Sequence, residues 1–248
     1  MGGYEDAILQ CLAVGDRKVA LDELEIQCAR LTGAALDLPA FGAAISELVA
    51  TGDLKREGQA VRRVEPDAAE VELEAHLVRH LESDFTSGLG VTNDDRVVEN
   101  TARGGTVGSG RWSRPDATLA VVRSWRFDPR RQLDVFSFEL KNRAGSNILA
   151  VHEALAHARF AHFPYLVCPR PSRTEHGHRV RQECAEHGVG LIHFSIHYRA
   201  GTLSVDGWAH DLEAVRHNPD PSRVDQYLSE RLTLRAQDKL EQLARGGR

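Results

Sequence analysis

The chain has 248 residues, 42% of them hydrophobic, and its 31 basic and 36 acidic side chains give a net charge of −5. This size and composition allow one large domain, or a small domain joined to a medium one. The sequence lacks the ~20 consecutive apolar residues of a membrane span and the order of a signal peptide. We therefore expect a cytoplasmic protein without a membrane partner, whose four scattered cysteines are reduced and buried.

The charge is distributed unevenly along the chain. Residues 108–181 hold 13 basic and 6 acidic side chains, whereas residues 66–107 hold 3 basic and 9 acidic ones. A local positive field of this kind is what a phosphate backbone requires, whatever the net charge. The alternative interpretation is a set of solvated arginines on loops.

The first 65 residues predict a small helical domain with a hairpin. Residues 4–14, 20–32 and 38–51 carry apolar residues at helical spacing. Asp37 is placed to cap the third helix, and Gly52 to end it. Residues 53–64 are typical of a short hairpin that turns at Glu57-Gly58.

Three helices followed by a hairpin resemble a winged helix-turn-helix domain. A version that reads DNA places polar and basic side chains on its third helix, yet Glu47 is the one charged residue of 38–51. The hairpin does carry basic side chains, at Lys55, Arg56, Arg62 and Arg63. We therefore expect this domain either to bind DNA or to contact protein, for instance as a homodimer.

Beyond a boundary at Pro66-Asp67, helical and strand patterns alternate. The expected helices cover 68–85, 147–161, 175–187 (ending at Gly188) and 221–245, the last as one charged amphipathic helix; the expected strands cover 95–102, 116–123, 133–141, 163–169 and 189–196, with a turn near Asp128-Pro129. Short connections favour antiparallel pairing and helical crossovers favour parallel pairing. We expect an α/β domain over 66–210, with a mixed central sheet flanked by helices, and a helical extension over 211–248.

The strand at 133–141 ends in Glu139-Leu140-Lys141. Apolar and polar residues alternate along it, which predicts a half-buried strand with one polar face. The preceding strand begins at Pro115-Asp116, 23 residues before Glu139. An Asp at the start of one strand and a Glu-x-Lys at the end of its hairpin partner can meet on one face. Lysine is also uncommon here, accounting for 4 of the 31 basic residues.

The two motifs, Pro-Asp at 115–116 and Glu-Leu-Lys at 139–141, resemble those of the PD-(D/E)xK, or restriction-endonuclease-like, nuclease superfamily. The resemblance covers most of residues 68–196, because the expected elements follow the αβββαβ order of that fold. It implies a Mg²⁺-dependent nuclease acting on DNA, with Mn²⁺ as a substitute ion. Asp116, Glu139 and the backbone carbonyl of Leu140 would be metal ligands, and Lys141 would orient the attacking water or stabilise charge on phosphorus.

Further candidates come from the same resemblance. The family often takes another acid from the first core helix, for which Glu74 is the first choice and Glu70 the second; a solvated helix start is the alternative. Arg114, Asn142 and Arg143 flank the acids as candidate phosphate contacts, or as exposed loop residues. Many members carry Gln and Tyr on the crossover helix, where this chain has Glu153 and His157. His157 is a candidate substrate contact, with a structural role as the alternative.

Other chemistries are disfavoured by the sequence. His152 and His157 are five residues apart, about 140° round a helix, and cannot share one metal ion there. His193 and His197 lack a convincing third ligand, and neither a nucleophile elbow nor a phosphate-binding loop is present. The competing hypothesis is a non-catalytic nucleic-acid-binding or regulatory protein that retains the nuclease fold.

Overall fold

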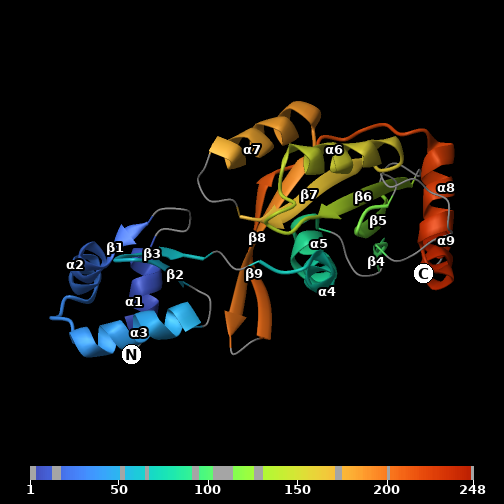
Figure 1. Cartoon of the computed structure of the whole chain (residues 1–248). Coiled ribbons are helices and arrows are strands. Elements are labelled where there is room, and N and C mark those ends of the chain that lie inside the picture. Colours follow the sequence, from blue (N-terminus) through green and yellow to red (C-terminus); the bar gives the residue numbers. More distant parts are fainter. Residues whose placement is uncertain are drawn as a thin grey trace. The chain divides into compact units, whose positions relative to one another are not determined.

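The computed structural model describes residues 4–12, 18–50, 54–64, 67–90, 95–102, 114–125, 131–170, 175–199 and 202–246. The chain divides into two compact units, Met1–Pro66 and Asp67–Arg248, each with its own hydrophobic core (Figure 1). Among the described helices, none combines the length and apolar character that crossing a bilayer requires.

The first unit packs three helices against a small antiparallel sheet. Its elements are α1 (Tyr4–Cys11), β1 (Val19–Ala20), α2 (Leu21–Thr32), α3 (Leu38–Ala50), β2 (Leu54–Glu57) and β3 (Ala60–Arg63), with strand order β1-β3-β2. The expected helices and hairpin are confirmed with slightly shorter bounds, and Gly58 takes the left-handed conformation of the turn, at φ 66°. Asp37 caps α3, since its Oδ1 accepts from Ala40 N at 3.3 Å. The expected stop at Gly52 lies outside the described residues.

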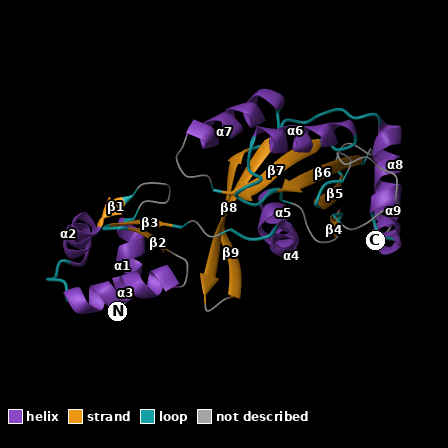
Figure 2. Cartoon of the chain, viewed as in Figure 1, coloured by secondary structure: helices purple, strands orange, loops and turns teal. Residues whose placement is uncertain are grey.

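The second unit is a six-stranded mixed sheet flanked by helices (Figure 2). Its strands are β4 (Arg96–Asn100), β5 (Ala117–Arg123), β6 (Gln132–Leu140), β7 (Phe163–Pro169), β8 (Gly190–Arg199) and β9 (Thr202–Leu212). Its helical segments are α4 (Glu70–His80), η1 (Leu81–Phe85), α5 (Thr86–Gly88), α6 (Ile148–Ala156), η3 (His157–Arg159), α7 (Glu175–His187), α8 (Pro221–Arg231) and α9 (Leu234–Arg245). The expected α/β class with a mixed sheet is therefore confirmed.

The strands of this sheet lie side by side in the order in which they occur in the sequence. The sheet order is β4-β5-β6-β7-β8-β9; β4, β5 and β6 pair antiparallel, β6, β7 and β8 pair parallel, and β9 returns antiparallel to β8. The two parallel connections run through α6 and α7, as helical crossovers must. The expected turn near Asp128-Pro129 lies outside the described residues.

Helices cover both faces of this sheet, which buries β6 from Asp134 to Leu140. On one face, α4 packs Leu73 and Leu77 against Phe136 and Phe138. On the other, α6 and α7 cover the parallel strands, and α8 and α9 cover β4 and β5 (Figure 1). The prediction of a half-buried strand was wrong for β6, since Asp134 through Leu140 are all buried. A strand inside a two-sided sheet leaves its polar residues in the interior.

The C-terminal region differs most from expectation. The prediction of a single helix over 221–245 was wrong, because α8 and α9 are separate helices. Thr233 caps α9, since its Oγ1 accepts from Ala236 N at 3.3 Å. The same hydroxyl donates to Glu99 Oε1 of β4 at 2.9 Å, so the contact with the sheet fixes the break. Strand β9 was not predicted, and the expected limit between 210 and 211 falls inside it.

Candidate active site

Asp116 lies immediately before β5, at the end of the β5–β6 hairpin where β6 finishes. Its backbone N donates to Phe138 O at 2.9 Å, which continues the strand pairing by one residue. Its carboxylate Oδ2 accepts from Leu140 N at 2.7 Å. These two bonds fix the Asp116 carboxylate against the Glu-Leu-Lys segment, so the structure brings the two sequence motifs together.

Glu139, Lys141 and Glu153 form a chain of charges beside Asp116. Lys141 Nζ donates to Glu139 Oε1 at 2.5 Å and to Glu153 Oε2 at 2.8 Å. Glu139 is 8% exposed, and the Lys141 side chain is 15% exposed. Glu153 comes from α6, the helix that follows β6 in the chain. The lysine is therefore held between a strand acid and a helix acid.

The electrostatics of the two candidate metal ligands follow from burial and from their proximity. Burial raises the pKa of Asp116 to about 6, against the hydrogen bond from Leu140 and the charge of Lys141. Burial and the charge of Asp116 raise the pKa of Glu139 to about 8, against the attraction of Lys141. Burial lowers the pKa of Lys141, but Glu139 and Glu153 outweigh it and raise that pKa above its ordinary value. Lys141 therefore stays charged throughout the pH range in which the acids titrate.

Both acids of α4 considered in the sequence reach this region. Glu70 Oε1 accepts from Asn142 N at 3.3 Å, and Glu74 Oε2 accepts from Asn100 Nδ2 at 2.9 Å. The negative charges of both raise the pKa of Asp116, with Glu70 contributing the larger effect. The structure therefore gives Glu70 at least as close an electrostatic relation to the site as Glu74, the first choice from sequence.

The candidate phosphate contacts lie in the segments next to the acids. Arg114 donates to Ala102 O at 3.5 Å, and Arg143 donates through Nη1 to Arg170 O at 3.2 Å. Both arginines and Asn142 are half-buried. Both arginines therefore bond to backbone carbonyls of neighbouring segments, and their role as phosphate contacts stays a prediction.

His157 lies beneath the site. It is 1% exposed, and its Nε2 is 3.6 Å from Glu139 Oε2, beyond ordinary hydrogen-bond length. Burial, together with the charges of Arg159 and Lys141, lowers the pKa of His157 to about 3, so its imidazole is neutral near pH 7. This burial favours the structural role over the direct substrate contact expected as a candidate.

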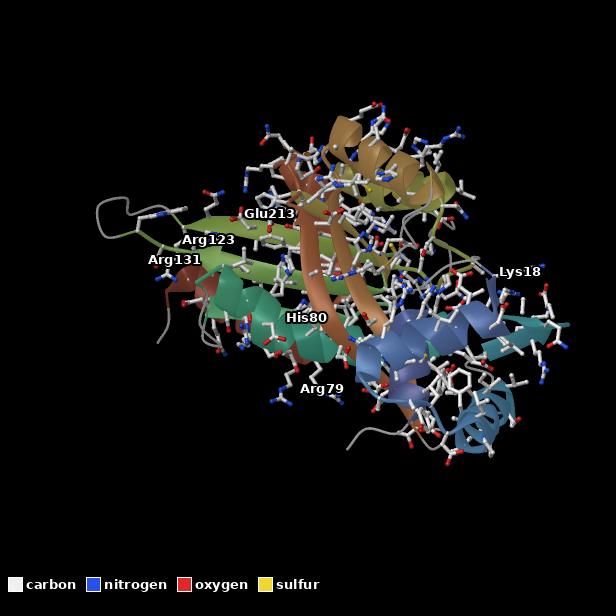
Figure 3. The ribbon with its side chains drawn as sticks, turned by 90° about the vertical axis from the view of Figure 1, so that its left-hand side faces the viewer. Lys18, Arg79, His80, Arg123, Arg131 and Glu213 are labelled. Atoms are coloured by element: carbon white, nitrogen blue, oxygen red, sulfur yellow. The ribbon has the colours of Figure 1, made fainter. Side chains whose placement is uncertain are left out.

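The opposite end of the hairpin carries a second buried acid with a different environment. Asp134 is 3% exposed and accepts from Arg123 Nε at 2.9 Å and from Arg216. Figure 3 shows Arg123 and Arg131 at this far end, away from the Asp116 end. Asp134 is thus neutralised by arginines, whereas Asp116 has a backbone donor and acidic neighbours.

The basic side chains of the N-terminal hairpin are engaged within their own unit. Lys55 and Arg62 of the hairpin form ion pairs with Glu57, as does Lys18, which precedes β1. The other two donate to backbone carbonyls, Arg56 to Gly58 O at 3.2 Å and Arg63 to Leu9 O at 3.1 Å. The positive charge of this hairpin is therefore partly neutralised locally.

The sequence interpretation missed the role of Glu153. Glu153 lies in the region of the crossover helix where many PD-(D/E)xK nucleases carry Gln and Tyr, but its contact with Lys141 was not predicted. The signal was present: Glu153 lies on the first turns of the helix that packs on β6 immediately after the motif. It also missed Asp67, whose carboxylate accepts from Arg143 N at 2.9 Å and from Ala144 N at 3.3 Å and so anchors the loop after Lys141.

The donor set at this site suits a hard divalent cation. Mg²⁺ uses one or two carboxylates and keeps several waters, and Asp116 and Glu139 are two neighbouring acids whose mutual repulsion a cation would relieve.

Comparisons of the chain with protein-family models, with curated proteins and with solved structures found no match. Any functional assignment therefore rests on the chemistry of the site.

The buried acids predict a pH-dependent stability of the metal-free protein. The folded-state pKa of Glu139, about 8, lies above its unfolded value near 4.3. Its contribution to stability is therefore fully present below about pH 4.3 and is lost as the pH rises through 8. We expect the melting temperature of Glu139→Gln, relative to wild type, to rise between pH 5 and pH 9 in EDTA. A constant difference across that range would contradict the prediction.

Proposed function

We propose that the chain is a metal-dependent nuclease of the PD-(D/E)xK type that hydrolyses phosphodiester bonds in DNA. The observation that carries the proposal is the junction of the two motifs, in which the Asp116 carboxylate accepts from Leu140 N beside the Glu139–Lys141 pair. The order α4, β4, β5, β6, α6, β7 supports it, since it follows the αβββαβ arrangement expected from the motifs.

Each residue has a distinct role in this proposal. Asp116, Glu139 and the Leu140 carbonyl would hold Mg²⁺, which when bound supplies charge neutralisation and a more acidic water. Lys141 keeps its proton and provides a positive charge at the position where a phosphorane would accumulate negative charge. Glu153 holds the ammonium group of Lys141 at 2.8 Å and so fixes its direction. Glu70 or Glu74 would add a further acid from α4.

The N-terminal unit is proposed as a winged-helix-like binding module. Its element order, three helices with a β2–β3 hairpin, supports that assignment. The pairing of Lys18, Lys55 and Arg62 with Glu57 favours a protein contact over a strongly basic DNA-reading surface.

The proposal is tested by incubating the full chain with supercoiled plasmid and with single-stranded DNA, in Mg²⁺, in Mn²⁺ and in EDTA. We expect cleavage in both metals and none in EDTA. Glu139→Gln, purified identically, controls for contaminating nuclease and should be inactive on every substrate. Equal cleavage by both proteins would assign the activity to a contaminant.

Absence of cleavage in every condition, with DNA binding that is equal in Mg²⁺ and EDTA and weakens steeply with salt, would overturn the proposal. The chain would then be a nucleic-acid-binding protein without turnover.

A further inference from the structure

A second cluster of metal-ligating side chains lies on the helices α6 and α7, apart from Asp116 and Glu139. His152 belongs to α6, and Glu183 and His187 belong to α7. Among the described residues, these three offer ligand atoms that all lie within 4.8 Å of one another. His152 was considered with His157 from sequence and that pair was rejected; folding supplies different partners.

The distances fit a small transition-metal ion. His187 Nε2 is 3.1 Å from Glu183 Oε1, and His152 Nε2 is 3.5 Å from the same oxygen. With metal–ligand bonds of about 2.0–2.2 Å, the ligand atoms of a tetrahedral zinc site are separated by roughly 3.3–3.5 Å. These two distances between ligand atoms are therefore already close to those of a tetrahedral zinc site.

The fold holds the three residues in place while leaving them accessible. Glu183 and His187 are four residues apart and share one face of α7. The two helices pack through a common core that includes Val151 and Cys184. The side chains are between 26% and 45% exposed, so an ion and a water molecule can reach them.

We propose that His152, Glu183 and His187 bind a divalent transition-metal ion such as Zn²⁺, with the remaining coordination position occupied by solvent. Two imidazoles and one carboxylate suit zinc, nickel or copper, whereas the carboxylate pair of Asp116 and Glu139 suits magnesium. The bound ion would link α6 to α7. Since Glu153 follows His152 directly and accepts from Lys141, this link would also restrain the helix that positions this lysine.

The experiment uses the untagged full chain, because a polyhistidine tag binds the same ions. Zn²⁺ is titrated by calorimetry in excess Mg²⁺, which occupies the oxygen site, and Co²⁺ binding is followed by its visible absorption. We expect one equivalent bound in wild type. His152→Gln, Glu183→Gln and His187→Gln should each weaken binding by at least about tenfold, since each removes one of three ligands.

His178→Gln is the matched control, because His178 is an exposed histidine on the same helix but outside the cluster. It should bind Zn²⁺ as wild type does, and circular dichroism should show all variants folded. Undiminished binding in the His152→Gln and His187→Gln variants, or no stoichiometric binding in wild type, would overturn the proposal. The cluster would then be a hydrogen-bonded surface contact between two helices. This test does not depend on whether the chain cleaves DNA.

Discussion

In the proposed nuclease, the Lys141→Met variant should lose metal-dependent cleavage by about 10²–10³-fold, the loss typical for removal of one group that stabilises transition-state charge. Lys141 is the cation that touches both Glu139 and Glu153, at 2.5 and 2.8 Å. Methionine fills the space of the lysine stem but carries no charge. The rate is measured as single-turnover cleavage of a defined DNA substrate at saturating Mg²⁺.

The same variant should be destabilised in a pH-dependent manner. Removing one partner of a buried ion pair destabilises by about 3–5 kcal/mol when the other charge stays in place. At pH 6 Glu139, whose pKa is raised to about 8, can take up a proton instead, so the loss should be small there and should grow toward pH 9. Denaturant unfolding at the two pH values measures this difference.

Lys141→Arg separates folding from catalysis. Arginine keeps the positive charge between Glu139 and Glu153, so stability should stay close to that of wild type. Its planar, extended guanidinium does not reproduce a compact ammonium group, so cleavage should still fall. Full activity in Lys141→Met, with normal folding, would remove Lys141 from the proposed mechanism.

The Asp116→Asn variant should lose Mg²⁺-dependent cleavage almost completely while remaining folded. The amide oxygen of asparagine can still accept from Leu140 N, which now donates to Asp116 at 2.7 Å. The negative charge that would hold the ion is removed. Mg²⁺ should therefore raise the melting temperature of wild type but leave that of the variant unchanged.

The raised pKa of Asp116 predicts a second effect of this substitution, which is a gain in the stability of the metal-free protein. A folded value of about 6 lies above the unfolded value near 3.9, so the ionised carboxylate destabilises the metal-free protein once the pH exceeds 6. In EDTA at pH 8, Asp116→Asn should be more stable than wild type by up to about 3 kcal/mol, at about 1.36 kcal/mol per pKa unit. Removing this proposed metal ligand should thus lower cleavage activity and raise metal-free stability together.

Asp134→Asn is the matched control on the same hairpin. Asp134 is more deeply buried than the half-buried Asp116, and its charge is paired with Arg123 and Arg216. Its loss should destabilise by about 2 kcal/mol, as for a hydrogen bond to a charged group, and should leave the Mg²⁺ response intact. If Asp116→Asn were destabilised in EDTA while Mg²⁺ still stabilised it, Asp116 would be a structural acid like Asp134.

The elements that local sequence signals define were predictable from the chain alone. Strand β7 and helix α7 have the expected bounds of 163–169 and 175–187, because a short apolar run and a glycine stop are local signals. Gly188, at φ 68°, ends α7 as expected. The hairpin of the first unit was found for the same reason, since the left-handed conformation at its turn favours glycine, which is Gly58 here.

Elements that depend on distant partners were not predictable. The break between α8 and α9 has no glycine or proline at its centre; it follows from the contact of Thr233 with Glu99 of β4. Strand β9 has exposed and half-buried residues in no regular alternation, and it pairs along the edge that β8 offers. Periodicity in one segment carries no information about such partners.

For the candidate site, too, one part could be predicted from the sequence and another part could not. The candidate residues could be named from the chain, because Asp116, Glu139 and Lys141 bring charges of the required sign at a spacing that a hairpin can close. Their environment depends on packing, since burial and neighbours from α4 and α6 set the pKa values of Asp116 and Glu139 and bring Glu153 to Lys141. Residue identity is a property of the chain, whereas desolvation and charge proximity exist only once distant segments pack together.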